Sequence, residues 1–185
     1  NRRQPETGQT PIPNAMPSYP APAKLNLDLR ITGRRADGYH ELESIFTLID
    51  LQDTLDIEPR DDGRIVLHTP LSDVPPEQDL CVRAARALQN FSGCLKGADI
   101  RVEKRIPTGG GLGGGSSDAA TVLMVLNRLW DLNLPSNTLQ KIGLTLGADV
   151  PFFLFGQSAF ARGIGEILTP LALPPQWYVL VRPNV

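Results

Sequence analysis

Hydrophobic and polar residues alternate along residues 23–33, a pattern typical of a β-strand that has one face on the core. One side of this strand carries only aliphatic residues, namely Leu25, Leu27, Leu29 and Ile31. The other side carries Lys24, Asn26, Asp28 and Arg30. We expect the aliphatic side to be buried, whereas the polar side is either a solvated strand face or the lining of a site.

Further segments have the short apolar runs of strands, namely residues 43–60 (as one bent strand or two), 64–69, 98–107, 158–166 and 177–183. Apolar residues recur at helical spacing in residues 79–90, 119–130 and 138–146. Asp79 and Ser136 are expected N-caps, and Gly147 is expected to end the last helix. This irregular order predicts an α+β domain, with a mixed sheet and helices on one side of it.

Six glycines fall within residues 109–115, interrupted only by Leu112. A loop without Cβ atoms lets a ligand approach the backbone, and the N-terminus of the helix expected after it attracts anions. Ser116, Ser117 and Asp118 follow the run and are good N-cap types. A flexible linker has a similar composition, but the flanking strand and helix favour a formed phosphate-binding loop. The run lacks the Gly-Lys-Ser/Thr ending of a P-loop and the acidic partner of a dinucleotide fingerprint.

Several single residues have both a functional and an ordinary interpretation. Tyr39 and His40 follow an Asp-Gly turn, where they either recognise a planar ring or only pack and bond to the turn. Lys104 lies on an otherwise apolar strand face, so its amine either reaches a cleft or extends to solvent. Asp149 is a candidate site residue or simply the N-cap of the next helical turn. His68 is most simply an ordinary strand residue, since no other metal-ligand type clusters near it.

The composition excludes several classes of protein. Among 185 residues, 18 are basic and 20 acidic, so the net charge of −2 offers no basic surplus for nucleic acid. The two cysteines, Cys81 and Cys94, match no metal-binding spacing and are expected to be buried thiols in a reduced compartment. No apolar run is long enough to span a membrane. Residues 1–20 are rich in proline and are expected to form a disordered arm or added sequence outside the domain.

Four separated stretches together resemble the GHMP family of small-molecule kinases, namely residues 20–44, 107–127, 146–156 and 161–166. The resemblance implies the family's N-terminal ATP-binding domain, with a fold like the second domain of ribosomal protein S5, over residues 21–170. Residues 171–185 then begin a second domain that is otherwise absent. On this view the chain is truncated, and we expect it to bind ATP poorly and turn over little by itself.

The resemblance also implies roles for individual residues. Lys24 and Asp149 match the family's catalytic pair, and Asp149 would also contact the substrate, as would Asn26, Tyr39 and His40. The residues that would bind ATP are Lys104, Pro107, Thr108, Gly109, Gly110, Gly111, Leu112, Gly113, Gly114, Gly115, Ser116 and Ser117. Mg²⁺ would accompany ATP with few protein ligands, and Ser116 or Ser117 is a candidate.

The implied reaction is ATP-dependent phosphorylation of the 2-hydroxyl of a cytidine diphosphate-linked methylerythritol, in the non-mevalonate route to isoprenoids. The partner is therefore a small molecule, with no nucleic acid and no membrane, and the protein is a monomer or weak homodimer. We expect a bacterial cytoplasm, or a plastid if the source is a plant. The alternatives are another GHMP kinase, for homoserine or a mevalonate-type alcohol, and a non-catalytic nucleic-acid-binding module of similar fold.

Overall fold

The computed structural model describes residues 17–34, 38, 40–70 and 74–181. The strands are β1 (Ser18–Arg34), β2 (His40–Arg60), β3 (Ile65–Leu67), β4 (Gly97–Glu103), β5 (Ala159–Gly163) and β6 (Ile167–Pro170). The helices are α1 (Leu80–Ser92), α2 (Gly114–Leu129), α3 (Ser136–Leu144) and α4 (Val150–Phe155), with a short 3-10 turn, η1 (Pro76–Gln78), before α1.

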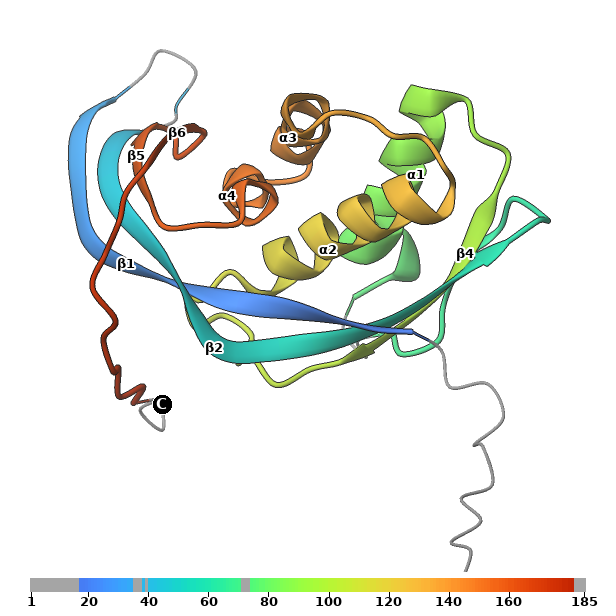
Figure 1. Cartoon of the computed structure of the whole chain (residues 1–185), viewed down its shortest axis with the longest axis horizontal. Coiled ribbons are helices and arrows are strands. Elements are labelled where there is room, and N and C mark those ends of the chain that lie inside the picture. Colours follow the sequence, from blue (N-terminus) through green and yellow to red (C-terminus); the bar gives the residue numbers. More distant parts are fainter. Residues whose placement is uncertain (1–16, 35–37, 39, 71–73, 182–185) are drawn as a thin grey trace, which may run out of the picture.

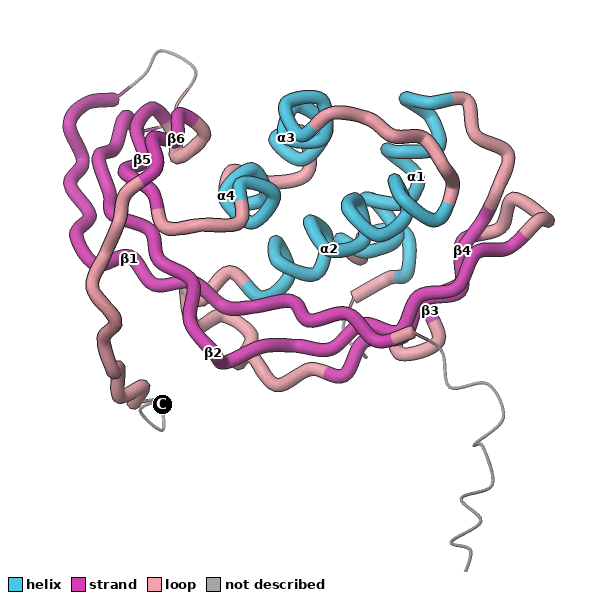
Figure 2. The backbone as a smooth tube through the Cα atoms, viewed as in Figure 1, coloured by secondary structure: helices cyan, strands magenta, loops and turns pink. Residues whose placement is uncertain are grey.

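The long strand β2 organises the sheet, whose strand order is β3-β4-β2-β5-β6 with β1 also paired to β2 (Figure 2). β1 pairs with β2 along one edge, while β5 and β4 pair with residues 42–46 and 54–60 of β2 on the opposite edge. Residues 47–53 of β2 therefore lie between these two partner strands. The β3–β4 pair is parallel and the others are antiparallel, so the sheet is mixed, as predicted.

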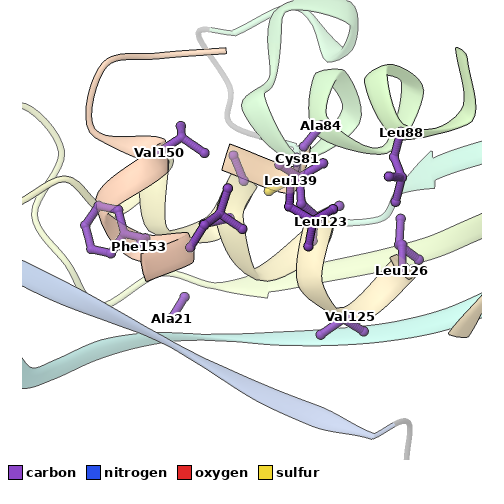
Figure 3. Packing of buried hydrophobic residues seen from close by; sticks show 14 of the residues in the cluster. Ala21, Cys81, Ala84, Leu88, Leu123, Val125, Leu126, Leu139, Val150 and Phe153 are labelled. Carbon is purple, nitrogen blue, oxygen red and sulfur yellow. The ribbon is translucent and has the colours of Figure 1, made fainter. Parts of the chain in front are cut away.

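All four helices lie on one face of the curved sheet (Figure 1), which confirms the predicted α+β class. Apolar side chains of α1, α2 and α4 meet between the helices and the sheet, above Ala21 of β1 (Figure 3). α2 lies at the centre of this layer, where Val122, Leu123 and Leu126 are fully buried. Within the part of the chain that the structure describes, no helix is long and apolar enough to cross a membrane.

The strand predicted at residues 23–33 is present, but the prediction of its buried face was wrong. Lys24 is only 3% exposed, whereas Leu29 and Ile31 are 52% and 66% exposed. From residue 26 to residue 32 both faces of β1 are exposed, so the aliphatic side covers no core there, and three register shifts in the β1–β2 pair interrupt the regular alternation. The second half of β1 also curves up beside β5 and β6, away from the helix layer (Figure 1).

Helix positions were predicted better than their ends. α1 begins as expected, and its N-cap Asp79 accepts a hydrogen bond of 2.8 Å from the backbone N–H of Cys81. α2 begins at Gly114 with Gly113 as its N-cap, so the expected cap residues 116–118 lie inside its first turns. α3 begins at Ser136 itself, with Pro135 at the N-cap position and Thr145, not Gly147, at the C-cap.

Two other expectations need correction at the ends of the domain. β1 begins at Ser18, so residues 18–20, assigned to the arm, pair with β2; residues 1–16 lie outside the described part. The strand predicted at residues 177–183 is wrong over its described part, because residues 177–181 have no regular secondary structure and pair with no described strand. Without a partner for its backbone, the segment leaves Trp177 99% exposed.

We predict that Gly97→Ala destabilises the domain by about 1–3 kcal/mol, as overpacking in a rigid core does. A Cβ at Gly97 would overlap the backbone carbonyl of Arg64, which accepts a hydrogen bond from the N–H of Ala98. Urea unfolding measures the loss. The matched control is Gly33→Ala, whose Cβ would lie at an ordinary 3.6 Å from Glu41 and which should shift stability by less than about 0.5 kcal/mol. Similar losses for both variants would contradict the steric explanation.

Candidate functional site

The glycine run forms a loop that leads into α2 and lines a pocket. Residues 106–116 contribute the loop wall, and Asp79, Leu80 and Cys81 at the start of α1 contribute the opposite side. Gly113 adopts a left-handed conformation (φ 73°), and a Cβ there would lie 2.7 Å from the ring of Phe153. Glycine is therefore required where the loop meets the helix, and the N-terminus of α2 faces a space that an anion can enter.

Lys24 is buried beside this loop and is held from several sides. Its backbone N–H donates to the carbonyl of Leu112 at 2.9 Å, which ties β1 to the loop. Its ammonium donates to the side-chain oxygen of Asn26 at 2.8 Å and lies 3.2 Å from the carboxylate of Asp149. The same nitrogen lies 4.6 Å from the centre of the Phe46 ring, a cation–π contact. These contacts give a desolvated ammonium a single defined position.

Asp149 reaches Lys24 from the start of α4. It occupies the N-cap position of that helix, as the sequence suggested, but its side chain makes no capping hydrogen bond. The carboxylate instead pairs with Lys24 and remains 34% exposed, whereas the lysine side chain is 4% exposed. α4 is fixed in place by the rings of Phe152 and Phe46, which pack edge to face at 5.1 Å. The structure thus joins two segments that lie 125 residues apart into one ion pair.

A second charged cluster lies on the other side of the loop. The ammonium of Lys104 is 2.5 Å from the carboxylate of Asp53 and 2.7 Å from that of Asp118. Lys104 follows the end of β4, so it is not on the strand face on which the sequence placed it. Burial disfavours its charged form, but Asp118 and Asp53 outweigh that effect, and the pKa of Lys104 is raised above its usual value. The lysine therefore stays charged beside the N-terminus of α2.

The two carboxylates of this cluster differ in how well they are satisfied. Asp53 is fully buried, and its second oxygen accepts hydrogen bonds from the backbone N–H groups of Arg105 and Ile106, at 2.5 and 2.8 Å. Asp118 is also buried, with 4% of its surface exposed. Burial raises the pKa of the Asp118 carboxyl to about 7, against the opposing effect of Lys104. Its Oδ1 atom is buried without a hydrogen-bond partner.

The other predicted site residues are distributed as follows. Ser116 lines the pocket, whereas Ser117 is buried and its hydroxyl donates to the carbonyl of Pro22 at 2.7 Å, which fastens α2 to β1. His40 is exposed at the start of β2, eight residues from Leu48, the register partner of Lys24. Tyr39 lies outside the described residues. Among the residues that are described, no group of three or more His, Cys, Asp or Glu side chains could hold a metal ion.

Sequence reasoning missed Asp53 and Phe46, which hold the two lysines. A signal for Asp53 was available, because Asp53, Leu55 and Ile57 alternate along β2 and all three are fully buried. An aspartate on the apolar face of a strand requires buried partners, and the lysine and backbone groups that serve it are about 50 residues away. Phe46 had no comparable signal, because a phenylalanine in a strand is ordinarily a core residue.

Fold and site together define an α+β domain in which a glycine loop leads into a helix N-terminus with two lysines beside it, an arrangement that suits an anionic ligand. Comparison with known proteins agrees with this class. Residues 79–157 match the family profile described as "GHMP kinases N terminal domain". The chain therefore carries a domain of the GHMP kinase N-terminal type.

Several curated relatives carry one name, 4-diphosphocytidyl-2-C-methyl-D-erythritol kinase. The protein of that name from Chromobacterium violaceum is 62% identical over 168 residues, 91% of this chain and 59% of its own length. The one from Neisseria gonorrhoeae is 60% identical over 174 residues, 94% of this chain and 62% of its own length. This chain therefore spans about 60% of the length of the curated relatives that it matches.

Solved structures show the same relationship. A crystal structure of 4-(cytidine 5'-diphospho)-2C-methyl-D-erythritol kinase matches 85% of this chain and 56% of its own, with 47% identity and a TM-score of 0.74. The mevalonate kinase of Methanococcus jannaschii matches 87% of this chain and 57% of its own, with 15% identity and a TM-score of 0.64. At that identity the second match indicates a shared fold alone.

We predict that Asp53→Ala destabilises the domain by about 3–5 kcal/mol, because it leaves two backbone N–H groups without their acceptor and removes one of the two carboxylates that pair with Lys104. Equilibrium unfolding in urea measures the change. Asp56→Ala is the control on the same strand, since Asp56 accepts one exposed hydrogen bond, from Ser18, and should cost at most about 1 kcal/mol. If Asp53→Ala were no more destabilising than this control, Asp53 would not anchor the loop.

Proposed function

We propose that this chain is the ATP-binding part of a kinase that transfers the γ-phosphoryl group of ATP to the 2-hydroxyl of 4-diphosphocytidyl-2-C-methyl-D-erythritol. The observation that carries the proposal is the Lys24–Asp149 ion pair of 3.2 Å, next to the glycine loop. The names and identities of the curated relatives support the choice of substrate.

Phosphoryl transfer requires positioning and positive charge around the transferred group far more than covalent participation by the protein. Lys24 suits the electrostatic part, because a desolvated ammonium interacts strongly with charge that develops on phosphoryl oxygens. Asp149 suits the acceptor side, because its carboxylate is partly exposed and can orient the attacking hydroxyl and take its proton. Asn26 completes the arrangement by accepting a hydrogen bond from Lys24, which limits where the ammonium can move.

The glycine loop is the proposed site of the triphosphate. Its backbone N–H groups, the N-terminus of α2 and the ammonium of Lys104 provide positive potential on one side of the pocket. Apolar side chains, including Val74, Leu80 and Val102, line the other side and suit a flat base. Mg²⁺ belongs to the proposal as the ion that bridges phosphate oxygens and neutralises part of their charge.

The acceptor alcohol distinguishes this proposal from its nearest alternatives. Kinases for homoserine or mevalonate share the fold, but their substrates carry no base for Tyr39 or His40 to recognise. The strand β1 and the start of β2, where His40 lies, extend away from the Lys24–Asp149 pair. An elongated substrate with a nucleotide at one end and a hydroxyl at the other suits the separation between His40 and the Lys24–Asp149 pair. A nucleic-acid-binding role has little support, because the net charge is −2.

We predict that Asp149→Asn in the full-length protein lowers kcat by at least about 100-fold, as expected for loss of an acid–base group. The dissociation constant of ATP should change by less than about threefold, since the substitution preserves shape and the loop is untouched. Steady-state kinetics and calorimetry give the two values. Asp131→Asn is the control, at an exposed left-handed position that asparagine tolerates. Equal losses in turnover and ATP binding would show that Asp149 is structural.

We also predict that the full-length protein, with ATP and Mg²⁺, phosphorylates the cytidine-linked alcohol but neither homoserine nor mevalonate. Cytidine diphosphate should compete with the alcohol substrate and not with ATP, because it occupies the acceptor side. Product formation followed by phosphorus NMR tests both statements. Turnover of homoserine or mevalonate, without inhibition by cytidine diphosphate, would replace the proposed substrate. Thermal stabilisation by RNA but not by ATP with Mg²⁺ would favour a binding module instead.

A further inference from the structure

The cluster of Lys104, Asp53 and Asp118 lies at the end of the pocket where the proposed triphosphate meets α2. A Cβ placed on Gly114, the first residue of α2, would lie 3.3 Å from the ammonium of Lys104. A cation beside a helix N-terminus is unfavourable by itself, since that end of the helix is already positive. The two carboxylates compensate for this, and they also leave the cluster with one negative charge in excess when all three groups are ionised.

Asp53 pairs with Lys104 and has protein partners for both of its oxygens. It is fully buried, one of its oxygens contacts the ammonium, and the other accepts two backbone N–H groups. Both oxygens of Asp53 therefore have protein partners. Its role is to hold β2, Lys104 and the residues that lead into the glycine loop together. The second carboxylate, Asp118, is the one that needs another explanation.

Asp118 is only half satisfied. Its Oδ2 accepts from Lys104 at 2.7 Å, while its Oδ1 is buried and accepts nothing from the protein. Its side chain is 5% exposed and belongs to the pocket lining. Buried carboxylate oxygens are ordinarily paired, so an unpaired one that lines a ligand pocket indicates a ligand with positive charge or hydrogen-bond donors. A phosphate group supplies neither, and a lone carboxylate beside it would weaken its binding.

The charge balance of the pocket indicates which ligand this is. Among the pocket-lining residues that the structure describes, Lys104 is the only cationic side chain, and it already serves two carboxylates. A triphosphate adds several negative charges to this space. The missing positive charge fits a hard divalent cation, which in nucleotide sites commonly has one or two carboxylates, water and phosphate oxygens around it.

We propose, building on the function proposed above, that Asp118 is the protein group that receives the divalent cation of the nucleotide, through Oδ1, directly or by way of one bound water molecule. Asp118 then makes the pocket selective for the metal complex of ATP over metal-free ATP. Without the ion the carboxylate repels the phosphates, and with the ion it attracts them. Of the two serines that were candidate ligands, Ser116 lines the pocket, whereas Ser117 lies outside the pocket lining, with its hydroxyl bonded to Pro22.

Calorimetric titration of the full-length protein with a non-hydrolysable ATP analogue, in excess Mg²⁺ and in EDTA, tests this proposal. The measured quantity is the ratio of the dissociation constant in EDTA to that in Mg²⁺. Asp118→Asn should lower this ratio by about tenfold or more, as the loss of a group that contacts a metal ion or its ligands typically does. Binding of the metal-free analogue should become tighter, because one negative charge is removed. An unchanged ratio would overturn the proposal.

Asp79→Asn is the matched control. Asp79 lines the same pocket and loses the same charge, but its carboxylate is engaged by the N–H of Cys81, and asparagine caps a helix equally well. Its general charge effect should lower the ratio by far less than Asp118→Asn does. An equal fall of the ratio in both variants would mean that general charge, not Asp118, sets the preference, and would also overturn the proposal. Wild-type protein that binds no nucleotide would instead refute the proposed function itself.

A second measurement uses the unaltered protein and does not depend on how the variant folds. Crystals grown with the analogue and Mn²⁺ in place of Mg²⁺ should give an anomalous peak within about 5 Å of Asp118 Oδ1, the reach of one ligand or one bridging water. A Mn²⁺ ion bound to the phosphates but farther from Asp118 would overturn the proposal, while leaving the assignment of the ATP site intact.

Discussion

The region around the glycine loop depends on one buried carboxylate, that of Asp53, which lies in the middle of β2. β4 and β5 pair with either end of one edge of β2, and residues 47–53 lie between them. There the carboxylate accepts the backbone N–H groups of Arg105 and Ile106 and pairs with Lys104, so a side chain replaces part of a strand ladder. An unpaired buried charge costs several kcal/mol, so these contacts are strongly favoured. They hold Arg105 and Ile106, the residues that lead into the glycine loop, in one position.

Two lysines lie beside neighbouring positions of the loop, and their carboxylate partners differ in exposure. Lys24 lies against Leu112 and Gly113, and its carboxylate partner, Asp149, is open to solvent and so to a substrate. Lys104 lies against Gly114, and both of its carboxylate partners are buried. On the function proposed here, Asp149 would face the reacting hydroxyl, and the cluster around Lys104 would lie near the phosphates. Small residues make this closeness possible, since Ala21 and Ala23 let α2 approach β1.

Local patterns in the sequence determined much of this protein. The glycine run, the amphipathic spacing of α1 with its Asp79 cap, and the irregular order of strands and helices were sufficient for the α+β class and for a loop that leads into a helix at residues 109–115, because each depends on neighbours in the chain. The residues around Asp149 also suggested that it lies at the start of a helical turn, which is α4 in the structure. Resemblance to a family, and not spacing, suggested the pairing of Asp149 with Lys24.

Tertiary structure decided what these patterns could not. Lys24 is buried, whereas both faces of β1 are exposed from residue 26 to residue 32, Leu29 and Ile31 included, so alternation by itself did not identify the buried side chains. Residues 177–181 have the composition of a strand but pair with no described strand, and pairing is what makes a strand. The contacts of Lys104 with Asp53 and Asp118 join three segments separated by 14 to 65 residues. Burial and charge pairing at such separations depend on the whole fold, because only packing decides which polar groups lose their water.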